Sequence, residues 1–241
     1  MPLHDHFRSP VNDRHSWDGL YGGWPCMIVR QLVAVLPEGF RSGPQINLGR
    51  YFEVNRGTDV DQQRAPSTRP ELECEGNPTF TVEAELTAEA KYEVRIYDTE
   101  FGRDLVAAIE IVCPTNKDRA ASRALFIAKV ASMVKQGICV TLIDPVSIRA
   151  ENLYVELFKL LDLTDSQLSP TPPPRDAVTL RARKPPKRRH LLDAWFYPMA
   201  VGQPLPTLPI WLAPDLGIML PLETSYAETC RVLGIGSAES A

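Results

Sequence analysis

The chain has 241 residues, a formal net charge of −4, and a composition of 44% hydrophobic and 23% charged residues. These fractions are close to the average of globular proteins, so they predict a packed core and exclude a chain that is disordered throughout. The length allows one large domain, or one domain with a substantial appendage. The slight negative charge argues against a protein that coats nucleic acid by bulk electrostatics, but it leaves room for a local basic cleft.

The number and spacing of the cysteines and the first residues of the sequence predict the cellular compartment. The five cysteines are odd in number and form no CxxC pair, which predicts reduced thiols in an intracellular protein rather than a disulfide framework or a zinc site. The opening MPLHDHFRSP lacks the charged start and apolar run of a secretory signal. The longest apolar runs are about eight residues, far short of the roughly 20 that span a bilayer. We therefore expect a cytoplasmic protein without a membrane partner.

The first predicted element is a helix that begins near Pro25 and stops at Leu36-Pro37-Glu38-Gly39. Proline suits the first turn of a helix, because its missing N–H has no partner there anyway. Ile28, Leu32 and Val35 give the helix an apolar stripe.

Three extended or irregular segments follow the first helix. A strand is expected at 45–55, a polar, proline-containing loop or insertion at 56–79, and a further strand-like segment at 79–86.

Residues 92–148 carry the clearest pattern, a strand–strand–helix–strand core. We predict strands at 92–98 and 105–112, joined by a turn at 99–104 that contains Gly102. The second strand is apolar on both faces, as a central strand covered on both sides would be.

The rest of this core is a helix and a buried strand. The helix is predicted from an N-cap at Asp118 to Gln136, where Gly137 stops it. The strand follows at 138–143, and a second helix is expected over about 149–161.

The amino-acid composition changes after residue 164, where prolines cluster. Residues 169–174 predict a stiff extended connector, and 178–183 and 190–197 predict two strands of a hairpin. An extended segment follows at 204–212. Ser225 and Glu228 form a capping box that opens a last helix ending at Leu233. We expect residues 1–163 to form the α/β core and residues 164–241 to pack on it.

Glu110 is the best candidate for a chemical centre, because it interrupts the apolar strand at 105–112. An unpaired buried carboxylate costs several kcal/mol, so a partner or a metal is expected. An equally weighted interpretation is structural: Glu110 faces a gap at the sheet edge, or pairs with an arginine.

The hairpin suggests which acid could join Glu110. If Asp98 stands opposite Leu105, then Glu110 falls opposite Glu93. Opposed side chains lie about 5 Å apart, close enough to share a divalent cation. Asp98 lies roughly 16 Å further along the strand, so we expect it to be a turn residue. A slip of one position would send Glu93 to the other face of the sheet.

Two lysines are candidate partners of the acids. Lys129 lies at the border of the apolar face of the 118–136 helix, where it could extend to solvent or reach the sheet to activate a water or stabilise phosphate charge. Lys117, just past the strand, is the second candidate amine.

The strand with Glu110 leads into the run Glu110-Ile111-Val112-Cys113-Pro114-Thr115-Asn116-Lys117. This run resembles a motif of a bacterial family of unknown function, domain of unknown function 4058. It is similar to the family pattern of Glu, a hydrophobic residue, any residue, Ser, Pro, any residue, Asn and Lys. The resemblance covers most of the chain outside 56–79 and continues at Lys129, Gly137, Ile143-Asp144-Pro145, Gly202-Gln203-Pro204-Leu205-Pro206 and Trp211-Leu212.

That family is distantly similar to the Uma-type endonucleases and, through them, to the PD-(D/E)XK nuclease fold. The resemblance implies a mixed sheet flanked by helices, here with a C-terminal proline-rich β-hairpin extension. It also implies that acids on two adjacent strands hold Mg²⁺ or Mn²⁺ for cleavage of DNA or RNA. Glu110 matches the second acid, and Lys129 matches a lysine that has moved from the strand to the helix.

The position aligned with the first acid departs from the pattern, because it holds Asn55. An amide oxygen can coordinate a metal but brings no negative charge, so Glu53 or Glu93 would have to compensate. Cys113 replaces the usual serine. Two hypotheses therefore stand: a metal-dependent phosphodiesterase, and a degenerate nuclease fold that acts as a binding or scaffold module.

Three further features have a functional and a structural interpretation. A basic cluster surrounds Pro185-Pro186 and could clamp phosphates, although a solvated hairpin tip is favoured about two to one. His4, His6 and His15 lack metal-ligand spacing and are expected at the surface. The aromatic residues Trp195, Phe196, Tyr197 and Trp211 are expected to be core anchors rather than base-stacking platforms.

Overall fold

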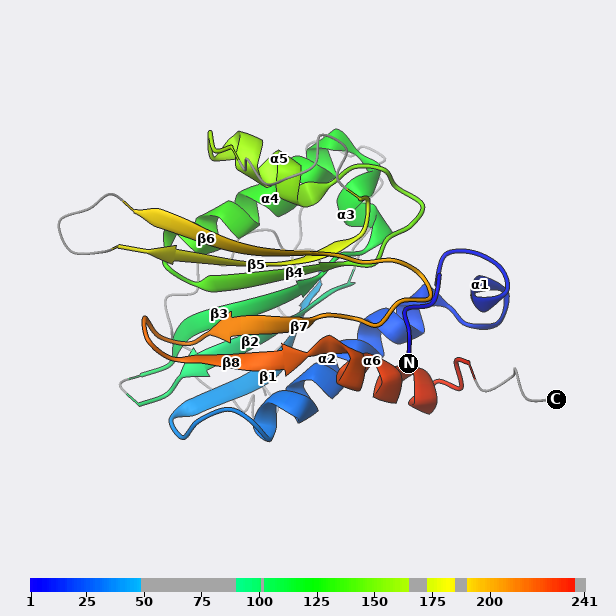
Figure 1. The fold of residues 1–241 in the computed structure, drawn as a ribbon, viewed down its shortest axis with the longest axis horizontal. Coiled ribbons are helices and arrows are strands. Elements are labelled where there is room, and N and C mark those ends of the chain that lie inside the picture. The colour runs from blue at the N-terminus through cyan, green and yellow to red at the C-terminus, as the bar shows by residue number, and fades with distance from the viewer. Residues whose placement is uncertain (49–89, 101, 165–172, 185–189, 237–241) are drawn as a thin grey trace, which may run out of the picture. The chain divides into compact units, whose positions relative to one another are not determined.

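The protein is described by a computed structural model that covers residues 1–48, 90–100, 102–164, 173–184 and 190–236. The main sheet has six strands in the order β1-β2-β3-β4-β5-β6, and β7 and β8 pair in a second, two-stranded sheet (Figure 1). The strands of the main sheet are β1 (Phe40–Leu48), β2 (Ala90–Asp98), β3 (Asp104–Ile111), β4 (Cys139–Asp144), β5 (Asp176–Arg183) and β6 (Leu191–Pro198).

The described residues also form six helices and the two strands of the small sheet. The helices are α1 (Val11–Arg14), α2 (Trp17–Val33), α3 (Pro114–Asp118), α4 (Ala120–Lys135), α5 (Leu153–Leu160) and α6 (Leu222–Val232), and the strands are β7 (Thr207–Trp211) and β8 (Gly217–Pro221). The pair β3 and β4 is parallel, whereas β2–β3, β4–β5 and β5–β6 are antiparallel. The expected α/β fold with a mixed sheet flanked by helices is confirmed at this level.

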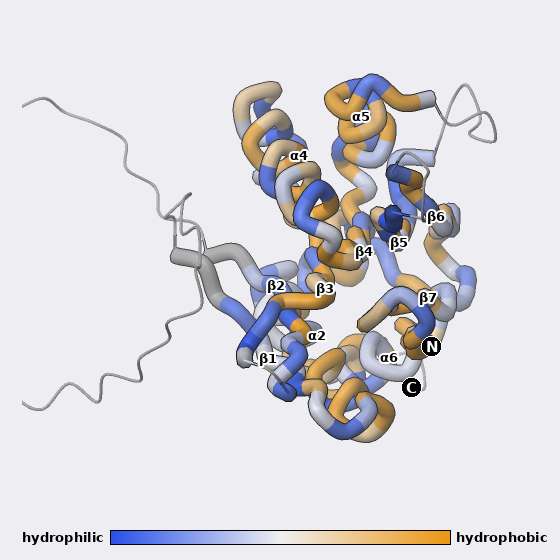
Figure 2. The backbone as a smooth tube through the Cα atoms, turned by 90° about the vertical axis from the view of Figure 1, so that its left-hand side faces the viewer, coloured by the Kyte–Doolittle hydropathy of each residue, from blue (hydrophilic) through white to orange (hydrophobic). Residues whose placement is uncertain are grey.

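The sheet buries side chains on both faces. One hydrophobic cluster joins α4 and α5 to the sheet through residues such as Ala108, Val140 and Val178. The other joins α2, α6, β7 and β8 to the opposite face through Ile109, Ile143 and others. In Figure 2, α4 and α5 lie on one side of the strands, and α2 and α6 on the other. Burial on both faces explains the continuous apolar run of β3.

The compact unit that carries these layers is made of Met1–Ile46 and Tyr92–Ala241, and Asn47–Lys91 forms a second unit. β5 pairs with β4, so the predicted C-terminal hairpin continues the main sheet within the first unit. The predicted segment 79–86, most of the 45–55 strand and the 56–79 insertion lie outside the described residues. No helix in the described part of the chain is long and apolar enough to cross a membrane.

The first long helix begins earlier than its sequence suggests. α2 starts at Trp17, where the Ser16 hydroxyl accepts a hydrogen bond from the Asp18 N–H at 3.2 Å, and Pro25 lies inside the helix. The prediction that Pro25 opens the helix is therefore wrong. Burial of a stripe that includes Leu20, Trp24 and Ile28 outweighs the cost of an internal proline.

Two other predicted caps are also wrong. Asp118 ends α3, and Arg119 is the N-cap of α4 without a side-chain hydrogen bond. α6 begins at Leu222, so Ser225 lies within the helix rather than at its start. The expected stop of α4 is confirmed, because Gly137 follows the helix with φ +85°, a conformation that suits glycine.

Candidate functional site

The β2–β3 hairpin places Glu93 opposite Glu110, as the sequence predicts. The route to this register differs from the one expected, because Asp98 stands opposite Asp104 rather than Leu105. A β-bulge between Ile96 and Tyr97 shifts the register by one position and restores the Glu93–Glu110 pair. Asp98 is a turn residue, as expected, and its Oδ1 accepts the N–H of Glu100 at 2.9 Å.

Both acids are buried on the face of the sheet that α4 covers. The exposed fraction is 1% for Glu93 and 4% for Glu110. Glu110 alternates with Ala108 and Val112, which belong to the hydrophobic cluster under α4. β3 lies between β2 and β4, so Glu110 does not face an open sheet edge.

Lys129 reaches from α4 to both carboxylates. Its Nζ donates to Glu93 Oε2 and lies 2.6 Å from Glu110 Oε1. The contact with Glu110 is electrostatic, because that oxygen receives no aligned hydrogen bond from the described residues. The Lys129 side chain keeps 31% of its surface exposed, whereas the two acids that it contacts are buried.

Arg95 binds the other side of Glu93. Its Nε donates to Glu93 Oε1 at 2.6 Å. The two residues are separated by one position on β2 and therefore share a face, which is the period-two signal that could have identified Arg95 from sequence. The arginine of the structural interpretation thus exists, but it binds Glu93 rather than Glu110.

The environment separates the pKa values of the two acids. Burial raises the pKa of Glu110 to about 8, and the charge of Glu93 adds to the rise while Lys129 opposes it. Burial also acts to raise the pKa of Glu93, but the hydrogen bond with Glu110 and the charges of Lys129 and Arg95 outweigh burial and lower it to about 2. The pair therefore carries one proton near neutral pH, with Glu93 ionised and Glu110 protonated.

Cys113 has a capping role next to this site. Its N–H donates to Asn116 Oδ1 at 3.0 Å, and its thiol completes a capping box at the start of α3. A serine at an N-cap makes the same kind of contact through its hydroxyl.

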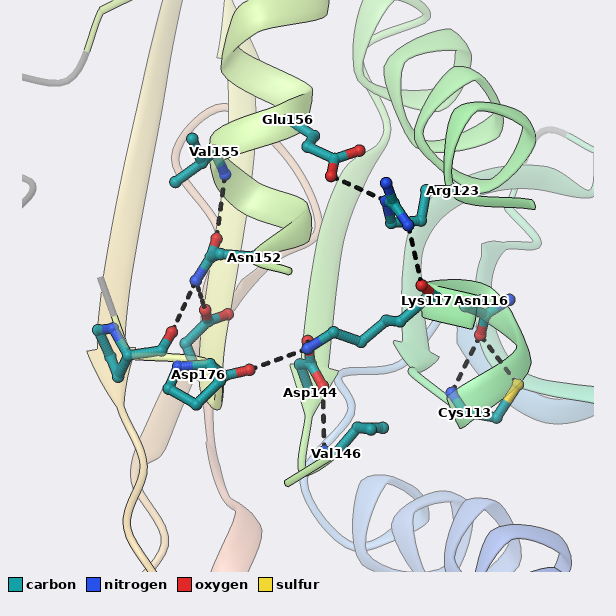
Figure 3. Close-up of polar contacts among 12 residues, drawn as sticks. Cys113, Asn116, Lys117, Arg123, Asp144, Val146, Asn152, Val155, Glu156 and Asp176 are labelled. Carbon is teal, nitrogen blue, oxygen red and sulfur yellow. Dashed lines mark hydrogen bonds and ion pairs between the residues drawn. The ribbon is translucent and has the colours of Figure 1, made fainter. Parts of the chain in front are cut away.

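Lys117, the second candidate amine, contacts a different carboxylate. Its Nζ donates to Asp144 Oδ2 at 2.8 Å and to the Pro174 carbonyl at 3.0 Å (Figure 3). The structure therefore brings together Glu93, Glu110 and Lys129 but holds Lys117 in a separate buried ion pair.

The two remaining predicted metal ligands, Asn55 and Glu53, lie outside the described residues. Among the residues that the structure does describe, no group of three or more His, Cys, Asp or Glu side chains could hold a metal ion. Of the predicted metal ligands, Glu93 and Glu110 are the two that the structure describes, and their carboxylates stand in opposed positions on adjacent strands.

The other sequence features have mainly structural roles. Arg183 pairs with Asp193 at 2.6 Å, and Arg181 stacks on Trp211 at 3.9 Å from the ring centre, whereas 185–189 lie outside the described residues. The expectation that His6 lies at the surface is wrong: it is buried, and its Nε2 lies 2.6 Å from the Tyr226 hydroxyl.

Comparisons of the chain with protein-family models, with curated proteins and with solved structures found no match.

Proposed function

We propose that the protein is a divalent-metal-dependent phosphodiesterase of the PD-(D/E)XK type that acts on nucleic acid. The observation that carries the proposal is the convergence of Glu93, Glu110 and Lys129: two opposed carboxylates on adjacent strands and an amine from the following helix. The resemblance to domain of unknown function 4058 implies the same roles for Glu110 and Lys129. It places Asn55 at the position of the first acid, and Glu93 would supply the charge that Asn55 lacks.

The carboxylates fit a cation, since they already converge on one positive group, the Lys129 amine. Glu93 and Glu110 would hold Mg²⁺ or Mn²⁺, which supplies charge that polarises a phosphodiester and lowers the pKa of a bound water. Arg95 keeps Glu93 ionised and ready to act as a ligand. Lys129, released from the carboxylates and partly exposed, is placed to bind a phosphate oxygen and to neutralise its charge.

A second candidate function, a degenerate nuclease fold that acts as a binding or scaffold module, has its own support. Arg95 and Lys129 already place two positive charges beside the two acids, so the acids need no metal to offset their negative charge. In that case the ion pairs are purely structural and a metal adds nothing to stability.

Cleavage assays with Mg²⁺ and Mn²⁺ on DNA and RNA, single- and double-stranded, test the proposal. We expect metal-dependent cleavage that falls about 100-fold or more in Glu110→Gln and in Lys129→Met, because each change removes several kcal/mol of charge stabilisation. Glu228→Gln is the matched control, since Glu228 pairs with Arg30 and Arg231 away from the site.

The melting temperature, measured at increasing concentrations of Mg²⁺ or Mn²⁺, distinguishes the phosphodiesterase from the scaffold function. A phosphodiesterase site predicts a rise in melting temperature with Mg²⁺ or Mn²⁺ that is lost in Glu110→Gln. Absence of both cleavage and a metal-dependent shift in the wild-type protein would favour the scaffold function.

A further inference from the structure

A second pair of acids lies on adjacent strands of the sheet, on β4 and β5 rather than on β2 and β3. Asp144 ends β4 and stands opposite Asp176, the first residue of β5. Both carboxyl groups are buried, with exposed fractions of 2% and 3%. Two ionised carboxylates in opposed positions repel each other, and burial removes the water that would weaken this repulsion.

Among the residues that the structure describes, one cation is bound directly to this pair. Lys117 from α3, itself fully buried, donates to Asp144 Oδ2 at 2.8 Å. From α5, the neutral Asn152 amide donates to Asp176 Oδ2 at 2.6 Å. Arg175 precedes β5 and acts on the charge of Asp144 from a distance, but its Nε makes no hydrogen bond within the described residues.

These contacts join the two acids to α3, to α5 and to the connector that precedes β5. Asn152 also accepts from the Val155 N–H at 3.0 Å, which caps α5, and donates to the Pro173 carbonyl at 2.9 Å. Lys117 donates to the Pro174 carbonyl. Figure 3 shows Lys117 and Asn152 approaching the two acids from opposite sides, so that the connector, α5 and α3 meet at one point.

We propose that Asp144 and Asp176 share one proton at neutral pH, and that loss of this proton at alkaline pH loosens the junction of α5 and the 173–175 connector with the sheet. With both acids ionised and only Lys117 bound to them, the junction contains an excess negative charge that burial disfavours. Opening the connector and the first turn of α5 to water relieves this charge at the cost of the Asn152 contacts.

The direction of the pKa shifts agrees with the charge argument. Burial raises the pKa of Asp176 to about 7, and the charge of Asp144 adds to the rise. Burial raises the pKa of Asp144 to about 6, with Lys117 opposing it. Because both values are raised above those of the unfolded chain, the stability from these protons is full below about pH 4, where the unfolded aspartates are also protonated. It is lost progressively as the pH rises from there to the folded values of about 6 and 7.

Thermal unfolding of Asp176→Asn at pH 5.5 and pH 8.5 tests the proposal. The amide is nearly isosteric, keeps an oxygen for Asn152 and cannot ionise. We expect the melting temperature of the variant, relative to that of the wild type, to rise by roughly 3 °C or more between pH 5.5 and pH 8.5. Asp118→Asn is the matched control, since Asp118 forms an exposed ion pair with Arg149. An equal pH dependence of Asp176→Asn and the wild type would overturn the proposal.

Two measurements on the wild-type protein decide the matter even if the variant fails to fold. The carboxyl carbon resonance of Asp176 should titrate with a midpoint above pH 5.5, and a midpoint near the ordinary value of about 4 would overturn the proposal. Amide exchange, corrected for the intrinsic effect of pH, should show that α5 loses protection at pH 8.5 while α4 keeps it. Equal protection of α5 at pH 5.5 and at pH 8.5 would also overturn the proposal.

Discussion

Glu93 lies between Arg95 and Lys129, and both contacts stabilise its ionised form in the folded chain. The pKa of Glu93 is lowered from 4.5 to about 2 for this reason, even though burial acts in the opposite direction. A lowered pKa means that the stabilisation is present above the unfolded value and disappears as the pH falls through the folded value.

Glu93→Gln should therefore lose about 2 kcal/mol of unfolding free energy at pH 7. The loss is partial, because Glu110 ionises more readily once the charge of its neighbour is gone and can then pair with Lys129. Urea unfolding at pH 7 and at pH 3 measures the effect, and the difference from the wild type should shrink as the pH falls from 4.5 toward 2. A difference that is the same at both pH values would contradict the assignment of Glu93 as the ionised member of the pair.

Lys117→Met tests the buried ion pair at the residue scale. It leaves Asp144 without its bound cation in a site closed to solvent, so we expect a loss of about 3 kcal/mol at pH 7. Arg149→Met removes the partner of Asp118 from an exposed pair and should cost at most about 1 kcal/mol. Urea unfolding of both variants makes the comparison, and equal losses would show that burial of the Lys117 pair has no energetic effect.

At the scale of elements, α2 and α6 illustrate how packing overrides a local signal. Ser225 and Glu228 have the spacing of a capping box, yet α6 begins three residues earlier at Leu222. Ser225 is buried, accepts a hydrogen bond from Trp24 Nε1 at 3.2 Å and donates to the Leu222 carbonyl at 3.1 Å. Its position is set by contact with α2, which the local sequence does not encode.

Ser225→Asp separates the two interpretations of this residue. An N-cap accepts Asp as well as Ser, so a capping role predicts little change. In the structure the new carboxylate would be buried beside Trp24, and we expect a loss of about 2 kcal/mol or more. Urea unfolding gives the answer, with Ser225→Ala as the variant that removes the hydrogen bond without adding a charge.

At the scale of the whole unit, the two hydrophobic clusters share one sheet. Trp17, Trp24 and Trp211 all lie on the side of α2 and α6. Trp195 is also on that side, because its ring centre is 5.9 Å from that of Trp211. Val130 lies in the other cluster, under α4. Tryptophan fluorescence therefore reports on one layer, while far-ultraviolet circular dichroism reports on both.

Val130→Ala should lower the stability of the whole unit by about 2 kcal/mol, through the loss of buried methyl groups. We expect the fluorescence and circular dichroism transitions in urea to shift together, because neither layer can keep its apolar surface buried without the sheet. A shift seen by circular dichroism alone would show that the α4–α5 layer unfolds separately.

Much of the core and part of the site follow from local pattern. The continuous apolar run of β3, the Gly102 turn and the Gly137 stop are effects of neighbouring residues on one another, so the sequence predicts them well. Glu110 stands out because it interrupts that run, and its opposition to Glu93 follows from the short connection between β2 and β3. The predicted Glu93–Glu110 pair is correct only because two differences cancel. The turn pairs Asp98 with Asp104 instead of Leu105, and the bulge between Ile96 and Tyr97 shifts the register back by one residue.

By itself the sequence determined the α/β class, most strands of the main sheet and the identity of the buried acid, because alternation, turn residues and a charge in an apolar strand are properties of adjacent positions. Tertiary structure alone decided that Lys129 meets both acids, that Lys117 binds Asp144, and that Asp144 faces Asp176. These pairings join segments far apart in the chain. Only the packing of helices on the sheet and the register of non-adjacent strands set the distance between such segments, and no local pattern carries that information.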